Sequence, residues 1–327
     1  MNFQTIPPIE TNKQLLDLAF SKARLRSTEQ KLSGNWLQII RKKETLKLDI
    51  IQDTLCSRLN QHLKYFPHTN DLSNFYIKLM HLTLDYPLYK QSLGAMNWAI
   101  QKIRFFQREF ASKITKETGK DKIYELSKQF YGRISSVIKQ IEPNLKYLEE
   151  CRKIMRTYPD VKDMPTVCIY GFPNVGKTTV LNLLTGTKAK VAEYAFTTKS
   201  INAGYFIIGD KKIQVLDVPG TLARKDKMNL IELQAELVLE ELANLVIFVF
   251  DFSGSVNIKE QEDLYKKIEK SEKKVLIYLS KKDLLDAEQL KTVSYPYYSL
   301  EELKAEIQVH FSKIELQSSN NKIDSGL

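Results

Sequence analysis

The segment "YGFPNVGKTTVLNLLTG", from Tyr170 to Gly186, constrains the fold more than any other part of the chain. It holds Gly171, four further residues and then Gly176-Lys177-Thr178, after an apolar strand-like run and before a helix-like run. Glycines at this spacing let backbone N–H groups approach phosphate oxygens, and the start of the following helix adds partial positive charge. The segment therefore predicts a phosphate-binding loop between a strand and a helix, in preference to a glycine-rich turn that binds nothing.

Each position of this loop has an expected part in binding. Lys177 would reach the β- and γ-phosphates, and the Thr178 hydroxyl would bind Mg²⁺. The residues expected to contact the nucleotide here are Gly171, Phe172, Pro173, Asn174, Val175, Gly176, Lys177, Thr178 and Thr179.

The residue pattern of the chain changes near residues 159–165, where "YPDVKDMP" predicts a linker. From 166 to 315, the strand-like runs "TVCIYG", "YFIIG", "KIQVLDV", "NLVIFVFDF" and "KKVLIYL" alternate with helical patterns after Lys177, Ile231, Lys259 and Ser299. Such alternation predicts a mostly parallel sheet flanked by helices. The polar segment 316–327 is predicted to be a disordered tail.

Residues 1–158 show helical periodicity, almost no glycine and no strand-type alternation. They predict a bundle of long helices, in which Trp36 and Trp98 would be core anchors. The patterns cover Thr11–Arg26, Thr45–Phe66, Ala95–Ile114 and Asp121–Tyr158, the last interrupted at most by Pro143.

Charge is concentrated in this helical half. Residues 1–160 hold 27 Lys and Arg against 16 Asp and Glu, a net of +11, whereas residues 161–327 hold 22 against 23, a net of −1. This asymmetry favours a polyanionic partner for the first half, and a solvated lysine-rich surface is the alternative. Candidate phosphate contacts are Arg41, Lys42, Lys43, Arg104, Arg108, Lys113 and Lys116.

Other features restrict the compartment. No apolar run approaches the roughly 18 residues that a membrane span needs, and the N-terminus does not resemble a secretory signal. The three cysteines, Cys56, Cys151 and Cys168, form no CxxC pair and predict neither a zinc site nor a disulfide framework. We therefore expect a cytoplasmic protein with no membrane or DNA partner.

Two segments after the loop would complete the phosphate site. In "VLDVPGT", Asp217 at a strand tip would hold Mg²⁺ through water, and Gly220 would offer its N–H to a γ-phosphate. In "YAFTTKS", Thr198 would complete the Mg²⁺ shell, with Thr197 as the alternate; both threonines could instead start a strand.

The segment "YLSKKDLL" would contact the base. Asp283 would accept from the two donors on a guanine edge, and the stem of Lys281 would lie over the ring. Guanine-specific loops usually have Asn at the position of Ser280, and the serine side chain has a shorter reach than that of Asn. Ser294 is a weaker candidate for a last guanine contact, and a charged strand-to-helix loop is the alternative interpretation of the whole segment.

Together these motifs resemble the OBG-type GTPases of the translation-factor class. "GFPNVGKTT", "YAFTTKSINAGYF" and "DVPGTLARKDKMNLIELQAELVLEELANLVIFVFD" are most similar to the nucleolar GTP-binding protein (NOG) family. "FQTIPPIETNKQLLDLAFSKARLR" and "LKYLEECRKIMRTYPDVKDMPTVCIYGFPNVGKT" resemble its helical N-terminal region and the junction that follows. The resemblance spans roughly residues 1–315, lacks the long C-terminal extension of eukaryotic members, and looks like the short form found in archaea.

The resemblance implies an α plus α/β fold, with a long-helix bundle followed by a P-loop GTPase domain. It implies GTP and GDP as ligands, Mg²⁺ as cofactor, and the large ribosomal subunit or its precursor as partner, with rRNA on the basic helices. Thr221 follows Gly220 where many GTPases have a catalytic Gln, so turnover would be slow. Lys177, Thr198, Gly220 and Asn174 would carry catalysis, with K⁺ held by Asn174.

Two alternatives belong to other classes of protein. One is a binding module in which the nucleotide is a structural plug and hydrolysis is negligible. The other is a GTP-dependent RNA-modification factor. Such a factor would require a reactive cysteine near the C-terminus, and the sequence has no cysteine after Cys168.

Overall fold

The computed structural model describes residues 3–30, 32–158, 161–162, 164–186, 202–208, 211–218, 230–254 and 256–324. Its contacts divide the chain into two compact units. The helical unit comprises residues 1–72 and 83–156, and the sheet unit comprises residues 73–82 and 157–327.

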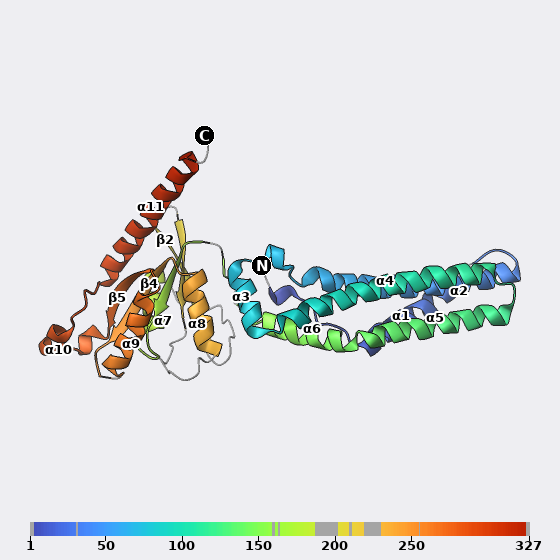
Figure 1. Ribbon diagram of the computed structural model, residues 1–327, viewed down its shortest axis with the longest axis horizontal. Coiled ribbons are helices and arrows are strands. Elements are labelled where there is room, and N and C mark those ends of the chain that lie inside the picture. The colour runs from blue at the N-terminus through green and yellow to red at the C-terminus, as the bar shows by residue number, and fades with distance from the viewer. Residues whose placement is uncertain are drawn as a thin grey trace. The chain divides into compact units, whose positions relative to one another are not determined.

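The helical unit is built from antiparallel helices, as the amphipathic patterns predict (Figure 1). Its elements are η1 (Phe3–Thr5), α1 (Asn12–Glu29), α2 (Trp36–Tyr65), η2 (Thr69–Asp71), α4 (Tyr86–Lys116), α5 (Lys120–Gln140) and α6 (Glu142–Met155). Thr11 and Asn35 begin α1 and α2 with capping boxes, in which each side chain accepts from the third helical N–H. The break between α5 and α6 falls at Ile141, because Pro143 suits only the first turn of a helix.

The apolar stripes of these helices meet in one core. Leu48, Leu55 and Leu59 of α2 and Ile103 of α4 are fully buried, as the helical periodicity of these segments predicts. At about 25 cal/mol per Å² of apolar surface removed from water, such stripes are the main source of stability in a bundle.

Trp36 does not belong to this core. The prediction of a core anchor was wrong, since its side chain is 61% exposed at the first residue of α2. The Lys120 ammonium at the start of α5 lies 5.3 Å from the ring centroid, so the indole is covered on one side by a cation. Trp98 is half-buried.

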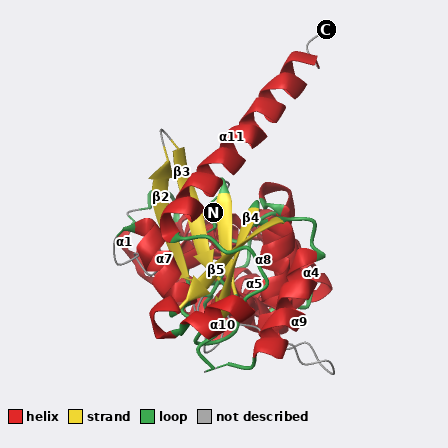
Figure 2. Ribbon diagram, turned by 90° about the vertical axis from the view of Figure 1, so that its left-hand side faces the viewer, coloured by secondary structure: helices red, strands yellow, loops and turns green. Residues whose placement is uncertain are grey.

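Among its described residues, the sheet unit contains one five-stranded sheet in the order β2-β3-β1-β4-β5. The strands are β1 (Thr166–Tyr170), β2 (Asn202–Ile208), β3 (Lys211–Asp217), β4 (Leu245–Asp251) and β5 (Lys274–Ser280). Only the edge strand β2 runs antiparallel, against β3, and the other pairs are parallel, as predicted. Figure 2 shows these strands side by side, and β1 and β4 are buried along their whole length.

Helices surround this sheet at the predicted places. They are α7 (Lys177–Thr185), α8 (Leu230–Glu241), α9 (Ile258–Glu269) and α11 (Leu300–Asp324), together with η3 (Lys282–Leu284) and the short α10 (Ala287–Thr292). The sequence did not indicate α10, because six residues are too few to show a helical period. Helix α11 continues to Asp324 and so differs from the disordered tail predicted for 316–327.

One helix joins the sheet unit from within the first half of the sequence. Helix α3 (Asn74–Thr83) belongs to it by contact. The Tyr76 hydroxyl accepts from the Val161 N–H at 2.9 Å, and the Lys78 ammonium donates to Glu241 at the end of α8. Among the described residues, no helix is both long and apolar enough to cross a membrane.

Candidate nucleotide-binding site

The loop from Gly171 to Gly176 adopts a shape that requires glycine at both ends. Gly171 has φ +149°, and a Cβ built on it would lie 2.6 Å from the Val249 carbonyl oxygen of β4. Gly176 has φ +94° and is the N-cap of α7. Side chains rarely adopt such backbone angles, so this local strain explains why the motif carries glycine there.

Lys177 closes the loop from inside. Its side chain is buried, and its Nζ donates to the Gly171 and Phe172 carbonyl oxygens at 3.1 and 2.7 Å. Phe172 and Val175 are buried beneath the loop, whereas Asn174 and Thr179 are exposed and Pro173 is half-buried. A buried ammonium next to a helix N-terminus is the arrangement that the sequence predicts for a phosphate-binding loop.

The sheet brings Asp217 beside the loop. Strands β1 and β3 are parallel neighbours with Ile169 opposite Asp217, so their carboxyl ends meet at one edge. The Thr178 hydroxyl donates to Asp217 Oδ2 at 2.5 Å, and Asn202 Nδ2 of β2 donates to the same oxygen at 3.2 Å. Asn202 was not predicted, since nothing in its local sequence distinguishes it.

The chemistry of this pair fits a magnesium ion. Burial raises the pKa of Asp217, while the Thr178 hydrogen bond, the Lys177 charge and the Asn202 hydrogen bond oppose that rise. A buried carboxylate beside a hydroxyl offers the hard oxygen ligands that Mg²⁺ prefers, and a divalent cation would favour the charged carboxylate.

The predicted base-binding loop follows β5. The Ser280 hydroxyl donates to the Phe250 carbonyl oxygen at 3.0 Å, and its Cβ lies 3.5 Å from where Gly176 would carry one. Lys281 has φ +51°, and its Nζ donates to Asp251 Oδ2 at 2.6 Å. Asp283 is exposed in η3.

Asp251 is a residue that sequence reasoning missed. It is fully buried at the end of β4, and its Oδ1 accepts from the Ser253 N–H and hydroxyl at 2.9 and 2.6 Å. Its backbone N–H donates to Gln261 Oε1 at 2.9 Å, which anchors the strand end to α9. A charged residue ending an apolar strand was the available signal.

Ser294 is not joined to the other site residues among the contacts of the described chain. It is exposed in the loop after α10. Tyr298 instead pairs in parallel with Tyr278, and its N–H donates to the Ile277 carbonyl oxygen at 2.9 Å. This pairing puts Ser299 at the carboxyl end of the sheet, where its hydroxyl accepts from the Glu302 N–H at 3.3 Å. The Ser-x-x-Glu capping box was the sequence signal for the helix start at this position.

Part of the predicted site lies outside the described residues. Thr197, Thr198, Gly220 and Thr221 all fall there. Within the described residues, no group of three or more His, Cys, Asp or Glu is arranged to hold a metal. Cys168 is fully buried in β1, as expected of a structural cysteine.

A phosphate loop between β1 and α7, with an acidic strand tip beside it and a Lys-x-Asp loop after β5, defines a P-loop GTPase domain. The chain matches the family model for a 50S ribosome-binding GTPase over residues 166–281. It also matches the model for the NOG1 N-terminal helical domain over residues 3–162. The chain belongs to the nucleolar GTP-binding protein 1 (NOG1) family, which confirms the resemblance found in its motifs.

Individual relatives extend along most of the chain. An uncharacterized protein of Methanocaldococcus jannaschii is 35% identical over 88% of this chain and 83% of its own length. Nucleolar GTP-binding protein 1 of Drosophila melanogaster is 30% identical over 88% of this chain and 45% of its own length. The Arabidopsis thaliana protein of that name is 30% identical, covering 93% of this chain and 46% of its own length, so the chain spans about half of these two relatives.

Among solved structures, the chain is similar to the G domain of the T. maritima FeoB iron transporter. The two are 33% identical, and the match covers 45% of this chain and 98% of that one with a TM-score of 0.36.

Proposed function

We propose that the chain is a GTP-binding and GTP-hydrolysing switch in assembly of the large ribosomal subunit. In this proposal, residues 1–158, apart from α3, form a basic domain that docks on rRNA, residues 159–165 link it, and residues 166–315 form the GTPase domain. The contact of 2.5 Å between Thr178 and Asp217, beside the buried Lys177, is the observation that carries the proposal.

The phosphates would lie along the N–H groups of Gly171 to Thr179, with the Lys177 ammonium turned from its loop carbonyls toward the β- and γ-oxygens. Thr178 would hold Mg²⁺ directly, Asp217 would hold it through water, and Thr198 would complete the shell. When bound, Mg²⁺ neutralises charge on the phosphate oxygens.

The base would be held by Asp283 and the stem of Lys281. Since the Ser280 hydroxyl already donates to Phe250, we assign Ser280 to supporting the loop and leave guanine selectivity mainly to the exposed Asp283. Ser299, beside the end of β5, is a better candidate than Ser294 for a last contact.

Hydrolysis would be attack of a positioned water on the γ-phosphate, with the charge stabilised by Lys177 and Mg²⁺. Because Thr221 follows Gly220 in place of Gln, we propose a slow intrinsic rate. Asn174 is exposed on the loop with φ +65°, and in this proposal its side chain holds a K⁺ ion next to the phosphates.

Three observations support the ribosomal partner. The matched GTPase model is that of a 50S ribosome-binding GTPase, and two relatives are named as nucleolar. The net +11 on residues 1–160 is suited to a polyanion such as rRNA. A cytoplasmic location is part of the same proposal.

The rival is a nucleotide-plugged RNA-binding module. Phosphate release would be followed with a molar excess of GTP, Mg²⁺ and K⁺ for the wild-type chain, Thr178→Ala and the control Thr185→Ala. Thr185 lies in the last turn of the same helix, and its hydroxyl donates to the Leu181 carbonyl oxygen. We expect many turnovers for wild type and Thr185→Ala and a loss of at least about tenfold for Thr178→Ala. Release of no more than one phosphate per wild-type chain would favour the plug.

A further inference from the structure

The helical unit contains a groove that the nucleotide site does not use. One cavity, of about 340 Å³, lies between α1, α2 and α5 and is lined by Phe20, Ala23, Arg24, Lys47, Ile51 and Tyr131. A second, of about 500 Å³, is lined by α2 and α5 and shares Lys47 and Tyr131 with the first. The two cavities are therefore adjacent, on either side of Lys47 and Tyr131, and we call the pair the α2–α5 groove.

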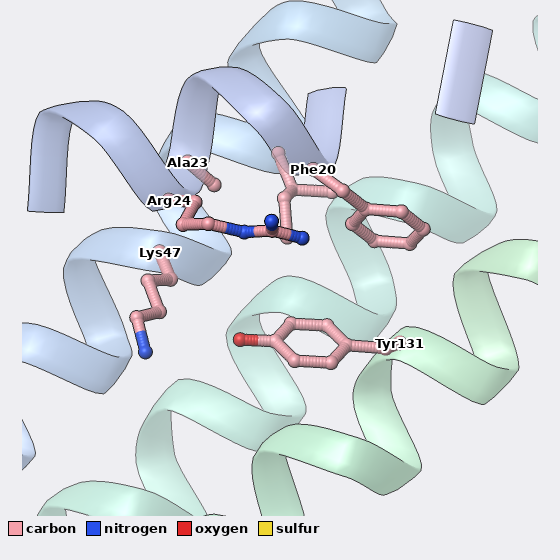
Figure 3. Close-up of a pocket in the computed structure, with 6 residues that line it drawn as sticks. Phe20, Ala23, Arg24, Lys47 and Tyr131 are labelled. Atoms are coloured by element: carbon pink, nitrogen blue, oxygen red, sulfur yellow. The ribbon is translucent and has the colours of Figure 1, made fainter. Parts of the chain in front are cut away.

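Aromatic rings follow this groove. Phe20 and Tyr131 meet edge to face, with ring centroids 5.6 Å apart. Figure 3 shows Phe20 and Arg24 facing Tyr131, whose hydroxyl points toward the side on which Lys47 lies. Tyr124 lines the second cavity and is 38% exposed.

The row continues to the exposed Trp36. On α5, residues 120, 124, 128 and 131 are spaced by three or four and so share one helix face. Lys120 begins that face and lies over the Trp36 ring. Trp36, Tyr124, Tyr131 and Phe20 therefore present successive rings along one side of the helical unit.

The polar groups of the groove balance one another. Arg24, Lys47 and Lys128 line it together with Glu44, Asp121 and Glu125. Lys47 donates to the buried Glu44 at 2.6 Å, so that pair is mutually neutralised. The groove consequently has no excess of positive charge with which to bind phosphate, although it lies in a half of the chain with a net charge of +11.

The hydroxyl of Ser127 lies beneath the groove and makes no hydrogen bond within the part of the chain that the structure describes. The residue is 2% exposed and lines the second cavity. Burial and the neighbouring Glu44 raise the pKa of Tyr131, so its hydroxyl stays protonated at neutral pH. The groove thus offers aromatic faces and the neutral Tyr131 hydroxyl, which complement the faces and edges of nucleobases.

We propose that the α2–α5 groove binds the unpaired bases of a single-stranded RNA segment, which stack on Trp36, Tyr124 and Tyr131. The inference rests on the proposed RNA partner of the helical unit and names where that unit reads unpaired RNA. The phosphate of the base stacked on Trp36 would lie near the Lys120 ammonium, which is next to that ring. A duplex keeps its bases stacked on one another and cannot fill the groove in this way.

Trp36 makes the proposal measurable. The chain has two tryptophans, so Trp98→Phe leaves Trp36 as the single indole fluorophore. An oligoadenylate of about 12 nucleotides, within the length that single-strand sites cover, would be titrated at low salt beside an RNA duplex and inorganic polyphosphate. We expect saturable quenching by the single strand and little change with duplex or polyphosphate.

Affinity measured by anisotropy of labelled RNA supplies the second readout. Tyr124→Ala should weaken single-strand binding about tenfold, because stacking on one aromatic ring is lost, and should leave the salt dependence unchanged. Phe105→Ala is the matched control, since Phe105 is 56% exposed on α4 with Lys102 5.8 Å from its ring but does not line the groove. Helical circular dichroism would verify that both variants fold.

The outcomes separate the groove from the proposed function. Quenching together with a selective loss in Tyr124→Ala supports the groove. If RNA binds equally well to Tyr124→Ala and does not quench Trp36, the RNA partner stands but the groove is not its binding site. The groove would then be left for a peptide partner. No binding of any RNA at low salt overturns both the RNA partner and the groove.

Discussion

Replacing Gly171 with alanine tests the steric demand of the phosphate loop. A Cβ there would lie 2.6 Å from the Val249 carbonyl oxygen and 3.0 Å from Val175 Cγ2. The carbonyl belongs to the central strand β4, so relief requires the loop or the strand to move. The φ of +149° adds backbone strain of about 1–3 kcal/mol. With the overlap included, we expect a loss of about 3 kcal/mol in local stability.

Two other glycines separate overlap from backbone strain. Gly186 ends α7 with φ +69°, but a Cβ there meets nothing within 4 Å, so Gly186→Ala should cost only about 1 kcal/mol. Gly132 lies inside α5 with nothing within 4 Å, so Gly132→Ala should stabilise the helical unit by about 0.5–1 kcal/mol.

Amide hydrogen exchange of the β4 segment is the assay, because it reports local opening of the sheet unit. A loss of 3 kcal/mol should accelerate exchange about 150-fold in Gly171→Ala, against about fivefold in Gly186→Ala. Binding of a fluorescent GTP analogue should weaken in Gly171→Ala in parallel. Equal exchange rates in the two variants would refute the steric argument.

Three further predictions concern charge. Burial raises the pKa of Asp217, so its ionisation destabilises the nucleotide-free fold as pH rises from the unfolded value of about 3.9 through the folded one. Without nucleotide, Asp217→Asn should therefore melt at a higher temperature than the wild type at neutral pH. It should also lose the stabilisation by Mg²⁺·GTP, which is about 2.7 kcal/mol at a ligand concentration of 100 times Kd. A wild-type response of the variant to Mg²⁺·GTP would contradict this. Burial would raise the pKa of Glu149, but the hydrogen bonds from Arg152 and the Ile9 N–H lower it overall. The helical unit should accordingly lose helical circular dichroism as pH falls below about 4.3 through the folded pKa, and Glu149→Gln, unlike the exposed Glu150→Gln, should flatten that transition. Finally, GTP turnover should be faster in K⁺ than in Na⁺, and Asn174→Ala should remove the difference; equal rates in the wild type would refute a K⁺ site.

The loop expected to bind phosphate could be predicted between a strand and a helix because its geometry is local. The spacing of Gly171, Gly176 and Lys177 dictates a loop between a strand and a helix, whatever the rest of the fold. Asp217 followed by the same reasoning, since parallel strands place their carboxyl ends at one edge, and its contact with Thr178 is in the structure. The five strands were recognisable from their β-branched runs.

What the sequence did not indicate depends on distant partners. Asn202 binds Asp217 only because β2 runs antiparallel to β3. Asp251 gains its role from Lys281, thirty positions later in the chain. Trp36 has the large apolar side chain of a typical core residue, but its position at the first residue of α2 leaves it exposed.

Helix α3 has the same kind of explanation. Its sequence falls within the predicted helical domain, whereas its contacts, from Tyr76 to Val161 and from Lys78 to Glu241, assign it to the sheet unit. Domain membership of one short helix is decided by such pairings, which local periodicity does not encode.

Co-sedimentation with large-subunit particles tests the central proposal most directly. The full chain would be centrifuged with the particles in Mg²⁺ and K⁺, once with a non-hydrolysable GTP analogue and once with GDP, beside Thr178→Ala. The account predicts retention with the analogue, release with GDP, and loss of this difference in the variant. Equal retention of the wild-type chain in both nucleotides, or no retention at low salt, would contradict a nucleotide-controlled switch on the large subunit.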